Sequence, residues 1–147
     1  MQIKGNALVK APPDRVWAAL NDPQVLARCT PGCKLLEPKG DSAYRVVLEL
    51  GLAAVKGRYE GEITISDRVP NTSYRMTISG DGLLGFMKGE GTISLQPVEE
   101  KTRLTYTLDA QVGGKVAGVG QRVLGGISKM LAGRFFSALE RELSSIQ

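Results

Sequence analysis

The chain contains six segments in which apolar and polar residues alternate, and one later segment with helical periodicity. Alternation with a period of two is typical of a β-strand that has one buried and one solvated face. A sheet with one apolar face needs an apolar partner, and only the stretch 115–146 is long and amphipathic enough to supply it. We therefore predict a curved antiparallel sheet around one long C-terminal helix, an architecture that commonly encloses a ligand cavity.

The predicted strands begin with residues 2–10 and continue with a short strand at about 34–37. Five more strands alternate cleanly, and their short, turn-rich connections favour an antiparallel meander. Two short helices are expected after the first strand, because Pro12-Pro13-Asp14 and Asp22-Pro23 are typical helix starts. The predicted fold class is α+β, with a seven-stranded sheet and one long helix in a single domain of residues 1–147.

The C-terminal segment has apolar residues at helical spacings of three and four. The stripe consists of Val116, Val119, Val123, Ile127, Met130, Leu131, Phe135, Leu139, Leu143 and Ile146. Five glycines interrupt this segment, and each weakens a helix by about 1 kcal/mol relative to alanine. We therefore expect the first half of the helix to bend or fray.

Composition and charge exclude several classes of protein. The net charge is +4 and well mixed, without a basic arm, and the aromatic residues are few and point inward, so we expect no nucleic-acid partner. No run of about 18 apolar residues is present, and the opening residues are strand-like rather than a signal peptide. These features predict a cytoplasmic protein.

Two short motifs are better explained by structural roles than by functional ones. Gly80-Asp81-Gly82-Leu83-Leu84-Gly85 matches the dinucleotide fingerprint, but an alternating strand follows it, so we predict a hairpin turn. Cys29 and Cys33 are four residues apart, and the chain has no histidine to complete a zinc site. We interpret the cysteines as structural, with a redox or metal role as the alternative.

The sequence offers little for catalysis. Histidine is absent, and the strand carboxylates all fall on the outward phase: Glu49, Glu60, Glu62, Glu90 and Asp109. We therefore predict no catalytic residues, no metal site and no cofactor.

All four tyrosines share the inward face of the predicted sheet. A buried phenol needs a hydrogen-bond partner, so an apolar pocket with phenolic donors would suit a hydrophobic ligand that carries carbonyl oxygens. The alternative is a solid core with hydroxyls at the sheet rim. The candidate ligand-binding residues are Tyr44, Leu48, Tyr59, Ile63, Tyr74, Met76, Ile78, Met87, Ile93, Tyr106, Leu108, Val119, Val123 and Ile127.

The chain resembles the CoxG family of carbon monoxide dehydrogenase subunits, within the START-like (SRPBCC) helix-grip superfamily. The resemblance covers essentially the whole chain. It rests on an ordered set of segments: Val16-Trp17-Ala18-Ala19-Leu20-Asn21-Asp22-Pro23, Pro31-Gly32-Cys33, Val55-Lys56-Gly57, Gly80-Asp81-Gly82, Gly85-Phe86-Met87-Lys88-Gly89 and Val112-Gly113-Gly114-Lys115-Val116-Ala117-Gly118-Val119-Gly120.

This resemblance implies a non-catalytic helper of molybdenum-containing dehydrogenases of the carbon monoxide dehydrogenase type. Members are linked to membrane recruitment of the enzyme and to binding a lipid-like quinone. The leading hypothesis is a cavity protein for a quinone- or lipid-like molecule that services a molybdenum hydroxylase. Weak peripheral membrane contact is a further expectation, because the final helix carries about +3. The alternatives are an interaction subunit with a filled core and a small START-like enzyme.

Overall fold

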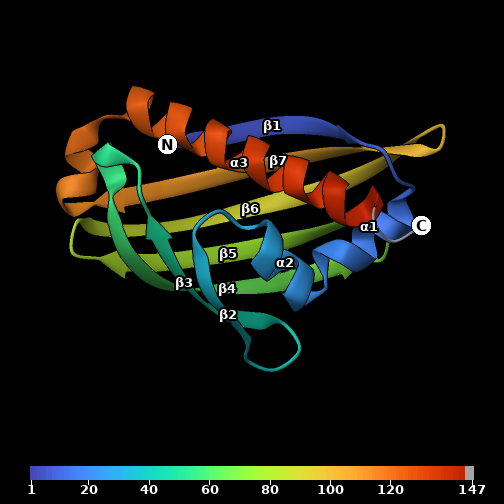
Figure 1. Cartoon of the computed structure of the whole chain (residues 1–147), viewed down its shortest axis with the longest axis horizontal. Helices are drawn as coiled ribbons and strands as arrows, with labels where there is room; N and C mark the ends of the chain where they lie inside the picture. The colour runs from blue at the N-terminus through green and yellow to red at the C-terminus, as the bar shows by residue number, and fades with distance from the viewer. Residues whose placement is uncertain (145–147) are drawn as a thin grey trace.

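A seven-stranded antiparallel sheet curves around one long helix in the computed structural model, which describes residues 1–144 (Figure 1). The strand order is β1-β7-β6-β5-β4-β3-β2, so β1 and β2 form the two edges. The strands are β1 (Gln2–Val9), β2 (Cys33–Pro38), β3 (Ala43–Leu50), β4 (Gly57–Val69), β5 (Ser73–Gly82), β6 (Gly85–Val98) and β7 (Lys101–Gly113). This arrangement confirms the predicted meander.

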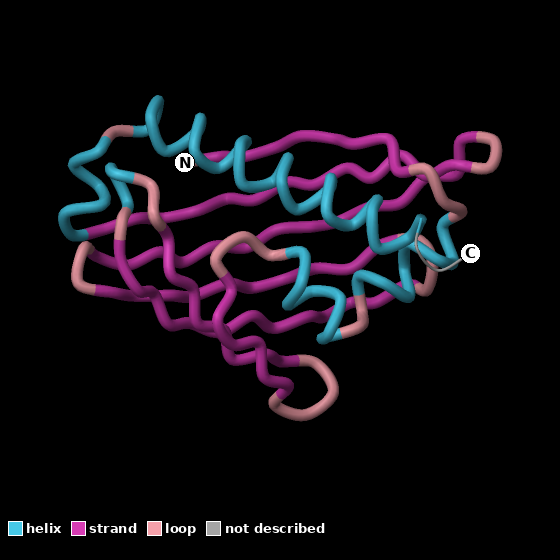
Figure 2. The backbone as a smooth tube through the Cα atoms, viewed as in Figure 1, coloured by secondary structure: helices cyan, strands magenta, loops and turns pink. Residues whose placement is uncertain are grey.

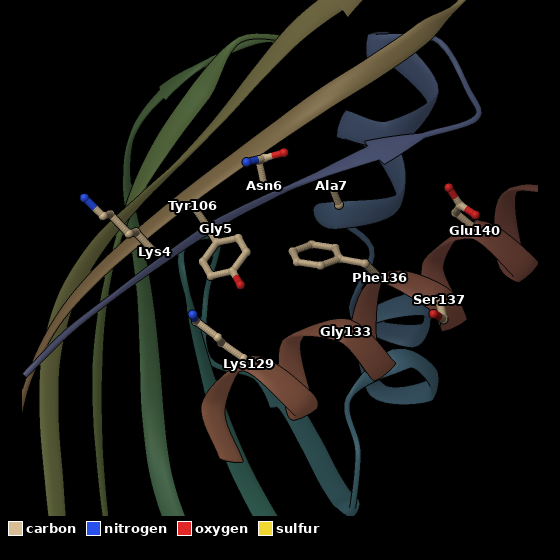
Figure 3. Close-up of a pocket in the computed structure, with 10 residues that line it drawn as sticks. All are labelled: Lys4, Gly5, Asn6, Ala7, Tyr106, Lys129, Gly133, Phe136, Ser137 and Glu140. Carbon is tan, nitrogen blue, oxygen red and sulfur yellow. The ribbon is translucent and has the colours of Figure 1, made fainter. Parts of the chain in front are cut away.

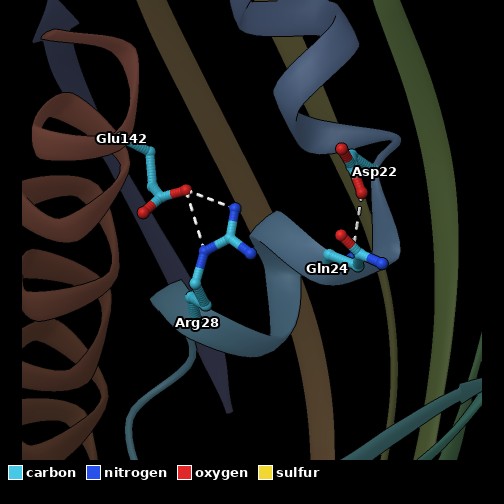
Figure 4. Close-up of polar contacts among 4 residues, drawn as sticks. All are labelled: Asp22, Gln24, Arg28 and Glu142. Atoms are coloured by element: carbon cyan, nitrogen blue, oxygen red, sulfur yellow. Dashed lines mark hydrogen bonds and ion pairs between the residues drawn. The ribbon is translucent and has the colours of Figure 1, made fainter. Parts of the chain in front are cut away.

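The helices lie on the concave side of the sheet (Figure 2). Helices α1 (Pro13–Leu20) and α2 (Pro23–Cys29) follow β1, and α3 (Gln121–Ser144) runs along the sheet. Two short 3₁₀ helices, η1 (Ala53–Val55) and η2 (Gly114–Val119), lie at the opposite end from α1 and α2. Helix α2 begins as predicted, because the Asp22 carboxylate accepts a hydrogen bond from the backbone N–H of Gln24 at 2.9 Å (Figure 4).

The register of the sheet places the predicted inward residues in rows across the strands. One row joins Tyr44, Ile63, Ile78, Gly89 and Ala110 on β3 to β7. The carboxylates predicted to face outward are all exposed, as the alternation indicates. The hairpin interpretation of the glycine motif is also confirmed, because β5 ends at Gly82 and pairs with β6 from Gly85.

The final helix begins later than the sequence pattern indicates. Gly114 and Gly120 have φ of +75° and +95°, values that favour glycine, and the segment between them forms η2. Helix α3 then starts at Gln121 and continues without a break through its three glycines. The predicted stripe is wrong at Val123 and Met130, which are 48% and 36% exposed, because the buried residues of α3, Leu124, Leu139 and Leu143, lie on a neighbouring face of the helix. Ile146 lies outside the described residues.

Two clusters of buried side chains lie between the helices and the sheet. The larger cluster joins α1, α2 and the second half of α3 to the sheet, with Leu104 and Leu139 fully buried. The smaller cluster joins Val55, Val116 and Leu124 at the η1–η2 end. Outside the core, Arg28 of α2 donates two hydrogen bonds, of 2.6 and 3.0 Å, to Glu142 of α3 (Figure 4).

Candidate functional site: an apolar cavity beneath the first half of α3

An apolar cavity of about 260 Å³ lies between strands β3 to β7 and the first half of α3. Its helical wall is formed by Leu124, Ile127 and Leu131, and its sheet wall mainly by inward residues of β3 to β7. The outward-phase residues Glu60, Glu62 and Ser79 also border the cavity. Val55 of η1 and Val116 of η2 line the same cavity. The first turns of α3 and the two short 3₁₀ helices together therefore close one end of the curved sheet over a hollow.

The cavity brings together six of the candidate ligand-binding residues. These are Leu48, Tyr59, Ile63, Ile78, Met87 and Ile127. The structure places the other eight elsewhere. Val119 packs against the smaller cluster, Leu108 is half-buried beside Gly89 and Gly91, and Val123 is exposed. Tyr44, Tyr74, Met76, Ile93 and Tyr106 belong to the larger packed cluster or lie against it.

The packed cluster explains why most of the tyrosines do not reach the cavity. Trp17 of α1 lies edge-on against Tyr74, with 5.8 Å between the ring centroids. Phe136 of α3 lies against Tyr106 at 5.4 Å. Burial raises the pKa of Tyr74 well above its usual value. The solid-core alternative therefore describes the half of the interior near α1 and α2, while the other half is hollow.

Glycines on neighbouring strands help to make the hollow. Gly61 and Gly80 are paired on β4 and β5, and both line the cavity. A Cβ at Gly80 would make only ordinary contacts, with its nearest neighbour 3.5 Å away. Because Gly80 lines the cavity, a larger side chain there would extend into the hollow. A Cβ at Gly61 would instead overlap the carbonyl oxygen of Ser79. Gly80 therefore leaves volume empty, whereas Gly61 allows the two strands to approach closely.

Two hydroxyl groups of the cavity wall, those of Tyr59 and Ser128, already donate to backbone carbonyls. Tyr59 donates to the carbonyl oxygen of Val55 at 2.7 Å, and Ser128 donates to that of Leu124 at 2.8 Å. Burial also raises the pKa of Tyr59. Of the four tyrosines, all within the described residues, Tyr59 alone lines the wall, so the expected set of phenolic donors is absent from it. The cavity suits hydrocarbon better than a ligand that needs hydrogen-bond donors.

Several residues of the wall are not among the candidate ligand-binding residues. Val116 and Leu131 belong to the predicted apolar stripe but not to the candidate residues, and Val55 and Leu124 belong to neither set. Met1 also lines the cavity, and its ammonium group donates to the carbonyl oxygen of Ala110. A signal was available for Val55, because it is the one β-branched residue in the connection between β3 and β4.

The cysteines lie apart from the cavity. Cys29 is buried and Cys33 is half-buried, and both are free thiols. Burial is the main cause that raises the pKa of each thiol, which disfavours the reactive thiolate. Among residues 1–144, no three histidine, cysteine or acidic side chains gather in an arrangement that could hold a metal ion. No helix in the described part of the chain has the length and apolar character to span a membrane.

Solved structures with the same architecture define the class of this protein. A conserved protein from Geobacillus kaustophilus matches with 42% identity and a TM-score of 0.96, over 99% of this chain and 96% of that one. A START superfamily protein from Mycobacterium smegmatis matches with 16% identity and a TM-score of 0.79, over 99% of both chains. A protein from Chromobacterium violaceum matches with 21% identity and a TM-score of 0.73, over 97% and 96%. The fold is the START-like helix-grip fold.

The family follows from a match over almost the whole chain. Residues 5–144 match the model of CoxG, a subunit of carbon monoxide dehydrogenase. No curated protein matches the chain significantly. The chain therefore belongs to the CoxG family, and its fold is START-like.

Proposed function

We propose that this chain is a non-catalytic binding protein whose cavity receives the apolar part of a quinone- or lipid-like molecule. The observation that carries the proposal is the apolar wall beneath α3, where the hydroxyls of Tyr59 and Ser128 are already bonded to backbone. Six of the candidate residues contact the ligand: Leu48, Tyr59, Ile63, Ile78, Met87 and Ile127. The remaining candidates support the wall from the packed half or lie outside it.

The size of the cavity limits what it holds. A volume of about 260 Å³ lies just below the range of roughly 300–1,000 Å³ typical of small-molecule pockets. It accommodates roughly nine groups the size of a water molecule, at about 30 Å³ each. One end of a hydrocarbon chain, or one substituted ring, fills such a space. The polar end of a longer ligand then lies outside the hollow.

Native mass spectrometry and titration test this proposal. A protein purified under gentle conditions should carry an apolar adduct, or should bind a short-chain quinone or a fatty acid in titration. Gly80→Leu places a side chain in the empty space and should abolish binding. Thr77→Leu is the matched control, because Thr77 is exposed on the opposite phase of the same strand and does not line the cavity. Equal binding by the wild type and Gly80→Leu would contradict the proposal.

We infer that the enzyme which this protein assists is a molybdenum-containing dehydrogenase of the carbon monoxide dehydrogenase type. The family description supports this partner. Affinity capture of the enzyme from a native extract, with wild type and Gly80→Leu side by side, tests it. If Gly80→Leu captures less of the enzyme than the wild type does, the result supports a protein that carries a ligand to the enzyme. Equal capture by both proteins favours the second candidate, an interaction subunit, which the filled half of the interior also supports.

Weak contact with an anionic membrane surface is a further part of the proposal. The supporting observation is that five basic residues of the C-terminal segment are exposed: Lys115, Arg122, Lys129, Arg134 and Arg141. Leu83, at the turn between β5 and β6, is also fully exposed near the cavity. Co-sedimentation with anionic vesicles should exceed that with zwitterionic vesicles and should fall as salt rises. Equal sedimentation with anionic and zwitterionic vesicles would contradict the proposed membrane contact.

A further inference from the structure

The outer edge of β1 has backbone groups that no other strand pairs. Met1 and Ala110 exchange two backbone hydrogen bonds, the pattern of a hydrogen-bonded pair in an antiparallel ladder. Such pairs recur at every second residue, so Ile3, Gly5 and Ala7 also bond to β7. The N–H and C=O groups of Lys4 and Asn6 consequently point to the free edge. Within residues 1–144, β1 is the terminal strand on this side of the sheet.

Helix α3 lies against β1 but leaves an open groove beside this edge. A groove of about 490 Å³ lies between β1 and the middle of α3 (Figure 3). The helix presents Gly133 and Ser137 to the groove, and these small residues leave the strand edge accessible. A Cβ at Gly133 would meet nothing within 4 Å. The groove is therefore bounded by a strand edge on one side and by a helix on the other.

The groove has an aromatic floor and oppositely charged ends. Tyr106 and Phe136 lie next to one another between β1 and α3 (Figure 3). Gly5 makes this possible, because a Cβ there would lie 2.5 Å from the Tyr106 hydroxyl oxygen. Lys129 lies at one end of the groove and Glu140 at the other (Figure 3). Eleven helical residues separate these charges by about 16 Å, which is the length of about five extended residues.

We propose that this groove binds an extended polypeptide segment, which adds to the sheet as a strand alongside β1. An unpaired strand edge next to a helix is the geometry in which β-strand addition operates, with main-chain hydrogen bonds for affinity and side-chain contacts for specificity. The charges select a segment with an acidic residue opposite Lys129 and an apolar residue over Tyr106 and Phe136. This site is separate from the cavity, and it goes beyond the proposed function.

A defined peptide array tests the proposal. The probes are acetylated hexapeptides of alternating valine and threonine, with aspartate placed in turn at each position. At least one should bind, and it should slow hydrogen exchange at the amides of Lys4 and Asn6. The same peptide with alternate amides N-methylated should bind at least about tenfold more weakly, because its side chains remain but its ladder donors are lost. Lys129→Glu should weaken binding about threefold at low salt.

Two glycine variants on α3 provide a matched pair. Gly133→Leu should fill the groove and abolish peptide binding, and Gly126→Leu should leave it unchanged, because Gly126 is exposed and lies outside the groove. Both positions have open space for a side chain, and both changes favour the helix, so folding is retained. Gly80→Leu should bind the peptide normally, which separates this proposal from the cavity.

Three results would overturn the proposal. One is the absence of binding by every peptide in the array. Another is peptide binding that Gly133→Leu leaves intact. The last is protection of the Lys4 and Asn6 amides that appears without peptide and rises with protein concentration, because the edge would then be covered by a second copy of the chain.

Discussion

The hydroxyl group of Tyr59 donates a hydrogen bond to the backbone carbonyl oxygen of Val55, and the two oxygens lie 2.7 Å apart. This bond fastens η1 to β4 at the wall of the cavity. Val55 in turn packs with Val116 and Leu124, which join η2 and α3 to the same end of the molecule. One phenol thereby holds a short 3₁₀ helix in the position that closes the hollow.

Tyr59→Phe should loosen this closure without removing the ring. The free energy of unfolding should fall by about 1 kcal/mol, the usual net value of one such bond. A bound apolar probe should also dissociate faster, because η1 is less firmly held. Urea unfolding and stopped-flow displacement measure the two effects. Tyr106→Phe, which removes a hydroxyl outside the cavity, should leave the dissociation rate unchanged; equal rates for both variants would show that the Tyr59 bond does not hold the cavity closed.

Alanine should affect the stability of the protein differently at the two paired glycines of β4 and β5. Gly80→Ala should be tolerated, because its Cβ meets only ordinary contacts. Gly61→Ala should destabilise the protein by about 1–3 kcal/mol, because its Cβ overlaps the Ser79 carbonyl and the strands must separate. Thermal or urea unfolding distinguishes the variants. A more severe loss at Gly80 than at Gly61 would mean that the strands approach in a different way.

Substitution of Leu139 tests whether the half of the interior near α1 and α2 is tightly packed. It is fully buried, so Leu139→Ala should cost about 2–5 kcal/mol of unfolding free energy. Leu83→Ala, at a fully exposed turn, should change it by no more than about 0.5 kcal/mol. Urea unfolding of both variants provides the comparison. A small loss at Leu139 would imply that this half of the interior is loosely packed.

The pair Arg28–Glu142 should make stability depend on acid pH. The hydrogen bond from Arg28 is the main cause that lowers the pKa of Glu142 below its ordinary value of 4.5. A carboxyl with a lowered folded-state pKa stabilises the fold above its unfolded-state pKa. That contribution is lost as pH falls through the folded-state pKa. Glu142→Gln should therefore have a lower free energy of unfolding than the wild type at pH 7, and this difference should shrink at pH 3. An equal difference at both pH values would show that the Arg28–Glu142 pair does not cause the pH dependence.

The sheet could be predicted because its signal is local and repeats. Tyr44, Ile63 and Ile78 form one inward row, as the alternation of three separate strands indicates. The outward phase of the carboxylates follows from the same period, and so does the hairpin at Gly82–Gly85. In each case the side-chain period of two fixes the face of every residue in the strand once one is placed.

The cavity could not be located in the same way because its position depends on long-range packing. The alternation does not distinguish Ile78, which lines the hollow, from Tyr74, which is packed against Trp17. That difference arises where α1 and α2 return over the sheet. The apolar period does not predict the start of α3, because Gly114 and Gly120 adopt positive φ and this backbone conformation leaves no mark on the spacing of apolar residues.

The most direct measurement is a titration with a short-chain quinone or a fatty acid, followed by NMR of isoleucine and leucine methyl groups. Shifts confined to Ile63, Ile78, Leu124 and Ile127, with Ile93 and Leu139 unchanged, are the predicted result. These shifts should vanish in Gly80→Leu and persist in Thr77→Leu. Saturating ligand that leaves all four cavity methyl groups unmoved, or that shifts Ile93 and Leu139 instead, would show that the hollow beneath α3 is not the binding site.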